Sequence, residues 1–166
     1  MNDPLYHVTF SRSLEGIAED GLRPGTGHNF AGYQGYAKGW LHLCDADALS
    51  GWFHKLLYSG QDTDDPVSDG VVLVVLRLTE DAESDLDIDV DELGNEAVPN
   101  GTSYRTTDTV PPDGLEVWDG TEWLPIWQWE SVNVEEGVRM ETDDGEEYAV
   151  TLDSEESPLF PPVDEL

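Results

Sequence analysis

The alternation of apolar and polar residues predicts a chain built mainly of short strands. Residues 5–9 read Leu-Tyr-His-Val-Thr, a short run of β-branched and aromatic residues that is typical of a strand. Residues 71–78 form a near-continuous apolar run rich in valine, which predicts a central strand buried on both faces. Residues 85–91 alternate aspartate with apolar residues and fit an edge strand or an anchored loop. Further strands are predicted at residues 40–44, 103–106, 115–118, 123–127, 138–141 and 148–151.

Helical periodicity is confined to the first third of the chain. The first predicted helix takes Ser11 or Ser13 as its N-cap and ends at Gly21, a residue suited to the C-cap. The second begins after Asp45 as N-cap and runs to about Tyr58. The order β-α-β-α, followed by several strands, indicates an α+β domain with two N-terminal helices.

Two dipeptides predict hairpin turns in the second half. Asp119-Gly120 and Asp144-Gly145 each stand between two predicted strands. The second turn defines a C-terminal hairpin, so we divide the chain into a main domain (1–130), a β-hairpin extension (131–152) and an acidic tail without regular structure (153–166). Four tryptophans are expected to pack in the core of the hairpins: Trp118, Trp123, Trp127 and Trp129.

Charge adds a second strong signal. The 166 residues include 37 acidic and 7 basic ones, a formal net charge of −30. Acids spread over the whole chain favour a surface adapted to high salt, where screening reduces self-repulsion. The sequence then resembles proteins of haloarchaea or their viruses. DNA mimicry by ordered carboxylates and simple solubility are the weaker alternatives. Such a charge also disfavours direct binding to nucleic-acid phosphate.

Several classes of function find no support in the sequence. No apolar run approaches the ~20 residues that span a bilayer, so no membrane partner is expected. Cys44 is alone and cannot form an internal disulfide, and nothing around it supports a nucleophile. The aspartates of residues 85–91 lack the glycine and terminal glutamate of a calcium loop. The histidines have no ligand spacing, so no metal site is expected.

Four segments carry a resemblance to a known family. They occur in the order seen in the ADP-ribosyltransferase-fold superfamily and are most similar in layout to the catalytic lobe of RNA 2′-phosphotransferases, over roughly residues 4–118. The resemblance implies an α+β fold of split antiparallel β-sheets. The first segment is Tyr6-His7-Val8-Thr9 together with Ile17 and the helix exit Gly21-Leu22-Arg23-Pro24. The second is Leu41-His42-Leu43-Cys44, and the third is the buried apolar strand at residues 71–78. The fourth is Asn100-Gly101 with Thr107-Asp108-Thr109-Val110-Pro111-Pro112.

The resemblance implies a site for NAD, used as a substrate. His7 would hydrogen-bond a ribose hydroxyl, and His42 would border the nicotinamide. Tyr104 falls at the third catalytic position, where the commonest enzymes of the fold have a glutamate. The catalytic candidates are thus His7, His42 and Tyr104, and the NAD-binding candidates are His7, Thr9, Tyr33, Tyr36 and His42. A strand histidine is more often a hydrogen-bonded core residue than a catalyst, and both interpretations stay open.

Two functional hypotheses follow. The first is an NAD-dependent ADP-ribosyltransferase-like protein that modifies a protein or nucleic acid acceptor. The second is a catalytically inactive protein of the same fold, with a structural or interaction role in a halophilic archaeon or its virus. A DNA-mimic inhibitor is a weaker third. The expected location is a high-salt cytosol or a virion, with a virion or host protein as partner.

Overall fold

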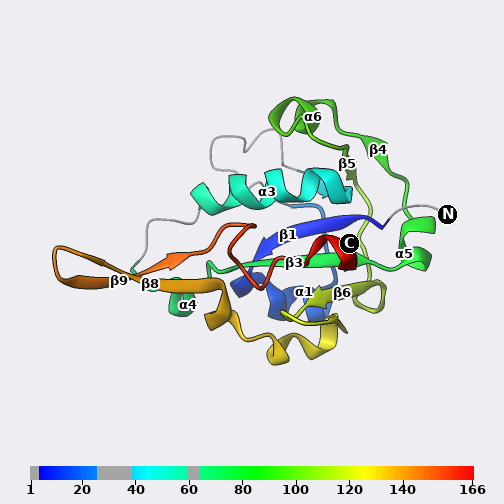
Figure 1. Ribbon diagram of the computed structural model, residues 1–166. Helices are drawn as coiled ribbons and strands as arrows, with labels where there is room; N and C mark the ends of the chain where they lie inside the picture. The colour runs from blue at the N-terminus through cyan, green and yellow to red at the C-terminus, as the bar shows by residue number, and fades with distance from the viewer. Residues whose placement is uncertain (1–3, 26–38, 60–63) are drawn as a thin grey trace.

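The computed structural model describes residues 4–25, 39–59 and 64–166, and it shows a mixed α+β architecture with an antiparallel sheet and a separate hairpin (Figure 1). The strands are β1 Tyr6–Phe10, β2 Leu41–Cys44, β3 Leu73–Leu78, β4 Asp89–Val90, β5 Ser103–Thr106, β6 Leu115–Trp118, β7 Trp123–Pro125, β8 Val138–Asp143 and β9 Glu146–Thr151. The helices are α1 Leu14–Asp20, α3 Ala46–Ser59, α4 Pro66–Asp69, α5 Glu80–Ser84 and α6 Glu92–Ala97, with short 3-10 segments between them.

The main sheet has seven antiparallel strands in the order β4-β5-β2-β1-β3-β6-β7. The predicted central strand is confirmed, because β3 lies between β1 and β6 and is almost wholly buried. Five residue pairs join β1 to β3, from Tyr6 with Arg77 to Phe10 with Leu73. Only one pair, Tyr6 with Cys44, joins β1 to β2 among the described residues. The sheet is therefore weakly connected between these two strands.

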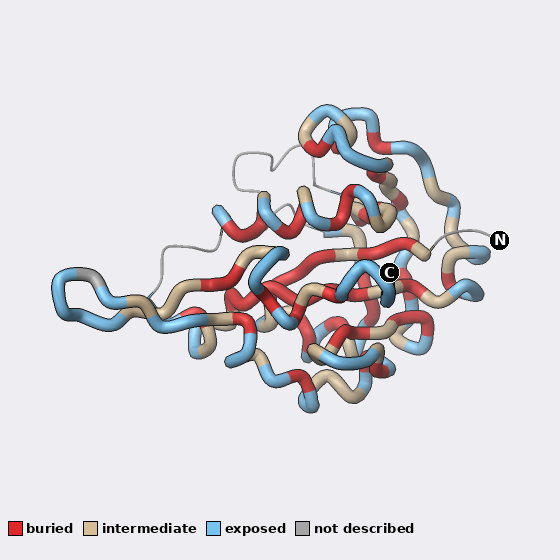
Figure 2. The backbone as a smooth tube through the Cα atoms, viewed as in Figure 1, coloured by how far each residue is buried: buried red, intermediate tan, exposed pale blue. Residues whose placement is uncertain are grey.

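Apolar side chains form a core on each face of the sheet, and the buried strands stand out in Figure 2. Helix α3 covers one face, where Leu49 and Phe53 meet Tyr6 and Val8 of β1. Helix α1 covers the other face. Because strand side chains alternate between faces, the central strand β3 contributes to both cores, with Val74 and Leu76 on the α1 side and Val75 on the α3 side.

The predicted helix boundaries are largely confirmed, with one correction. Gly21 ends α1 with a φ of 84°, and Asp45 accepts a hydrogen bond from Ala48 N at the start of α3 (3.0 Å). The prediction of a serine cap for α1 is wrong. Ser13 precedes the helix but its side chain makes no capping bond, because residues 11–13 already form a 3-10 turn with helical backbone angles.

The prediction for the segment after Trp123 also needs correction. Strand β7 ends at Pro125, and a 3-10 segment, Ile126–Ser131, replaces the rest of the predicted strand. This change of backbone turns Trp127 outward, and its side chain is 68% exposed. Trp118 is buried as expected, and Trp123 packs edge-on against it at a ring distance of 5.4 Å.

The acidic stretch from residue 80 to 97 contains two short helices that periodicity did not predict. Thr79 caps α5 and Asp91 caps α6, each through its side-chain oxygen. Between them lies β4, which pairs with β5 at the edge of the sheet. Before it, Leu86 and Ile88 pack half-buried against the α1-side core, so residues 85–91 combine a two-residue edge strand with an anchored loop.

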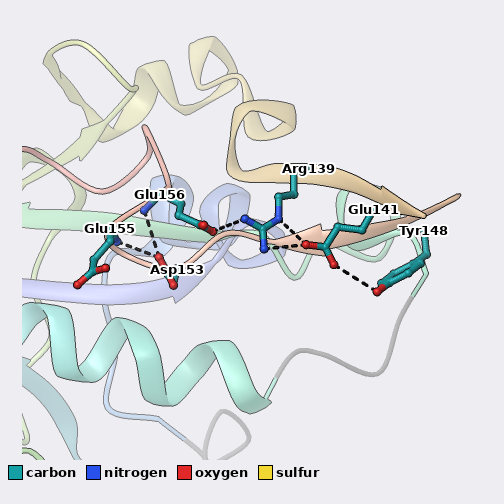
Figure 3. A network of polar contacts seen from close by, with 6 residues as sticks. All are labelled: Arg139, Glu141, Tyr148, Asp153, Glu155 and Glu156. Atoms are coloured by element: carbon teal, nitrogen blue, oxygen red, sulfur yellow. Dashed lines mark hydrogen bonds and ion pairs between the residues drawn. The ribbon is translucent and has the colours of Figure 1, made fainter. Parts of the chain in front are cut away.

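The predicted C-terminal hairpin is confirmed and projects from the body of the molecule (Figure 1). Its turn places Asp144 and Gly145 at positive φ (53° and 90°), as a two-residue hairpin turn requires. At its base, Arg139 pairs with Glu141 at 2.7 Å and with Glu156 at 2.6 Å (Figure 3). Exposed pairs of this kind contribute little individually but hold the hairpin to the following segment.

The tail after residue 152 has almost no regular structure, as predicted, but it is packed against the sheet. Leu159 is fully buried in the α1-side core, and Trp118 Nε1 donates to Pro158 O at 2.9 Å. Phe160 meets Phe53 edge-on in the α3-side core. The tail is thus part of the folded unit.

Candidate functional site

A cavity of about 630 Å³ opens beside the weak join between β1 and β2. Residues 6–9 of β1 and 41–44 of β2 contribute to its lining. Ser13 precedes α1 and also lines the cavity, α1 adds Gly16 and Ile17, and α3 adds Trp52 and Leu56. The segment after α1 also lines it, at residues 21–25. The cavity therefore lies where two of the four resembling segments meet.

His7 lies in this lining and is held by a backbone hydrogen bond. Its Nδ1 is 2.8 Å from the carbonyl oxygen of His42. A carbonyl oxygen can only accept, so Nδ1 carries the proton and Nε2 is left as an acceptor when the ring is neutral. Desolvation by burial lowers the pKa of His7 from 6.5 to about 4, although the bond to His42 opposes this. The imidazole is therefore neutral at pH 7.

His42 is held by a carboxylate from another element. Its Nδ1 is 3.0 Å from Oδ2 of Asp91, the residue that caps α6. Asp91 is only 1% exposed, and its other oxygen accepts from Gly94 N at 3.0 Å. The ring of His42 is thus fixed by a buried acid 49 residues away in the sequence.

The two imidazoles leave the sheet on opposite faces and are connected through the backbone of β2. His7 lies between Tyr6 and Val8, which both face α3, so its own side chain leaves β1 on the α1 side. His42 lies between Leu41 and Leu43, which face the α1 side, so its side chain leaves β2 toward α3. Both residues line the cavity, and the His42 carbonyl is the atom that connects them.

The cavity lining is uncharged or basic. Arg23 lines it, together with the two histidines, and none of its described lining residues is an aspartate or glutamate. Trp40, also in the lining, carries the guanidinium of Arg105 over its ring at 4.0 Å. In a protein of net charge −30, a described lining without acids reduces the repulsion that an anionic ligand meets at this cavity.

The other predicted site residues differ in position. Thr9 is 2% exposed and lines the cavity with His7. Tyr104 lies on β5, opposite Leu43, and packs half-buried against the α1-side core. It is not among the described residues that line the cavity. Tyr33 and Tyr36 lie outside the described residues. The structure therefore brings His7, Thr9 and His42 to one cavity, whereas Tyr104 is paired with the lining residue Leu43 without being one of the described lining residues itself.

Metal binding and thiol chemistry gain no support from this geometry. Within the described ranges, no three His, Cys, Asp or Glu side chains cluster in a way that could hold a metal ion. Cys44 lines the cavity, but burial raises the pKa of its thiol far above the usual range, which leaves it protonated and unreactive. Among the residues that the structure describes, no helix is both long enough and apolar enough to cross a membrane.

Asp91 is the site residue that sequence analysis missed. The pattern around it, aspartate before Glu-Leu-Gly, fits a helix N-cap, but the alternating aspartates before it hid that signal. Its contact with His42 depends on the pairing of β2 with β5 and of β5 with β4. No local pattern encodes such a contact.

Comparison with protein-family models, curated proteins and solved structures finds no match for this chain. The residues of the cavity and the motifs they belong to are therefore the basis for assigning a function to this chain.

Proposed function

We propose that this chain is an ADP-ribosyltransferase-like protein that binds NAD in the cavity between β1 and β2. The observation that supports this most is the position of two motif residues. His7 and His42, which the sequence resemblance implies as ligands of NAD, both line one cavity at the point where the sheet is weakly joined. A ligand could reach between the strands there without breaking a continuous ladder.

The chemistry of His7 suits a ribose hydroxyl. With Nδ1–H directed to the His42 carbonyl, Nε2 accepts a hydrogen bond from a donor in the cavity. Burial keeps the ring neutral, so this lone pair is available throughout the physiological pH range. A single acceptor of fixed direction is what is needed to orient one hydroxyl of a ribose ring.

The remaining lining residues fit the rest of a dinucleotide. Trp40 offers an aromatic face, and Arg23 offers a positive charge to a phosphate group. The absence of acids from the described lining removes repulsion between the protein and the two phosphates of NAD. A volume of about 630 Å³ lies within the range of small-molecule sites.

In the proposed reaction, the bond between nicotinamide and ribose breaks and nicotinamide leaves. An acceptor atom of a protein or nucleic acid takes its place on the ribose and releases its proton to solvent. The protein would hold the ribose through His7 and border the nicotinamide with His42. The acceptor must tolerate a surface of net charge −30, which favours a protein acceptor over nucleic acid.

A second candidate is a catalytically silent protein that keeps the NAD site. It is favoured by Tyr104, which the sequence resemblance implies at the third catalytic position, because this residue is not a carboxylate and is not among the described residues that line the cavity. Without a carboxylate next to the ribose, stabilisation of an oxocarbenium-like transition state is weaker.

Calorimetric titration with NAD in 2 M KCl, followed by an assay for released nicotinamide, tests both candidates. Saturable binding at millimolar NAD or below with nicotinamide release supports the transferase. Saturable binding without release, in the presence of a lysate of candidate acceptors, supports the silent protein. The absence of any heat of binding at millimolar NAD contradicts both.

A further inference from the structure

Asp91 makes contacts that a helix cap alone does not explain. It is buried to 1% exposure, where an unpaired carboxylate is costly. One oxygen, Oδ1, accepts from Gly94 N and caps α6 at 3.0 Å. The other, Oδ2, accepts from the imidazole Nδ1 of His42, also at 3.0 Å. The same carboxylate thus stabilises a helix and holds the ring of a residue that lines the cavity.

Asp45 is a helix cap that does not bind a histidine among the described residues, and it serves as the comparison. Its Oδ1 accepts from Ala48 N and caps α3, and its Oδ2 accepts from the backbone N–H of Thr102, each at 3.0 Å. Both aspartates use one oxygen for a helix N-terminus. Asp45 gives its second oxygen to the backbone, and Asp91 gives its second oxygen to His42.

The bond from His42 to Asp91 determines which ring nitrogen carries the proton. An ionised carboxylate only accepts, so Nδ1 of His42 must donate. In the neutral ring Nε2 then has the lone pair, and the ring plane is fixed by the buried acid. The backbone carbonyl of the same residue fixes His7 in the same tautomer. Asp91 therefore anchors the residue through which both imidazoles are positioned.

We infer that Asp91 is the positioning carboxylate of this site. It acts on the ligand through His42, and it replaces the acid that is missing at the third catalytic position. The effect of Asp91 on NAD binding rests on the proposed function. Its effect on the His42 ring rests only on the two contacts of Asp91. Asp91 does not itself line the cavity, so its effect must pass through the tautomer and orientation of the His42 ring.

Asp91→Asn is the decisive variant because it preserves the helix cap but replaces the hydrogen-bond acceptor facing His42 Nδ1 with a donor. Asparagine is a good N-cap, so its oxygen still accepts from Gly94 N. Its amide group then donates to Nδ1 of His42 and forces the proton onto Nε2. Asp45→Asn is the matched control, with the same substitution at a helix cap that has no histidine partner.

Two-bond 15N–1H correlation spectra of the imidazoles give the first readout. We expect His42 to carry its proton on Nδ1 in the wild type and in Asp45→Asn, and on Nε2 in Asp91→Asn. A proton on Nε2 in the wild-type protein overturns the inference, and this result needs no variant to fold.

The second readout is the dissociation constant for NAD, measured by titration in 2 M KCl. We expect a loss of about tenfold or more in Asp91→Asn and less than about twofold in Asp45→Asn. In a His42→Gln background, Asp91→Asn should cause no further loss, because its effect passes through the ring. Equal losses with and without His42 overturn the inference.

A wild-type protein that shows the Nδ1 tautomer but does not bind NAD contradicts the proposed function, and with it the role of Asp91 toward NAD. A wild type that binds NAD with the Nε2 tautomer contradicts only the inference about Asp91.

Discussion

At the scale of single residues, His7 combines a structural and a chemical property. Its ring is held by the His42 carbonyl and desolvated, and desolvation is the main reason that its pKa falls from 6.5 to about 4. The folded protein therefore binds fewer protons at this ring than the unfolded chain does between these two pH values. Linkage makes this a source of pH-dependent stability.

We predict that His7 makes the fold less stable as the pH falls from 6.5 to 4. Above pH 6.5 its ring is neutral in both states, and its contribution is fully present. Full protonation would remove on the order of 3 kcal/mol of the free energy of unfolding. His7→Asn keeps a donor for the His42 carbonyl but does not titrate. Chemical unfolding of both proteins at pH 4 to 7.5 in constant salt measures the difference between them.

The pH-dependent contributions of the other titratable groups are the same in both proteins, so they cancel when the two free energies of unfolding are subtracted. Glu83 has a pKa raised by desolvation, so its protonation stabilises the fold as the pH falls, in both proteins alike. A difference in stability that is independent of pH would show that the His7 ring has the same proton affinity in the folded and unfolded states.

At the scale of elements, the sequence predicted those features that depend on neighbouring residues. Gly21 as a helix end, Asp45 as a cap and the Asp144-Gly145 turn all follow from local backbone chemistry. The prediction of a strand at residues 126–127 is wrong, because a tryptophan-rich run has the composition of a strand in any conformation.

The candidate site was predictable only in part, for the same reason. His7 and His42 stand in short motifs, and the structure places both at one cavity. Asp91 belongs to the site through a contact across 49 residues, which strand pairing alone brings about. The packing of the C-terminal tail is another long-range feature, since its proline-rich composition predicts no regular structure and says nothing about where it docks.

We predict that the tail is an element of the core. Leu159→Ala should lower the free energy of unfolding by about 2–4 kcal/mol, because a fully buried leucine leaves a cavity when truncated. Val163→Ala is the matched control, at a residue of the same tail that is 85% exposed, and should change stability by less than about 0.5 kcal/mol. Urea unfolding followed by tryptophan fluorescence measures both. Equal, small effects would mean that the tail is not docked.

At the scale of the whole molecule, charge dominates the behaviour of the fold. A net charge of −30 produces self-repulsion that salt screens. The few ion pairs among the described residues include the exposed pairs of Arg139, which are too weak to offset it. The fold itself is held by the two apolar cores, so salt is expected to act mainly by reducing repulsion.

We predict a melting temperature that rises steadily between 0.1 and 2 M KCl. A variant with Glu122, Glu146 and Glu147 replaced by glutamine, all exposed, should show a smaller rise because less repulsion remains to be screened. Differential scanning calorimetry of both proteins measures this. A melting temperature that does not change with KCl would contradict a surface adapted to high salt.

The most direct test of the central claim is a calorimetric titration of NAD into three proteins in 2 M KCl. These are the wild type, His7→Asn and His54→Asn, the last at an exposed residue of α3 that does not belong to the cavity lining. We expect saturable binding by the wild type and His54→Asn, and a loss of at least about tenfold in His7→Asn, whose asparagine keeps the bond to His42 but lacks the Nε2 acceptor. Equal affinity in all three proteins, or no binding by the wild type, would contradict an NAD site at His7.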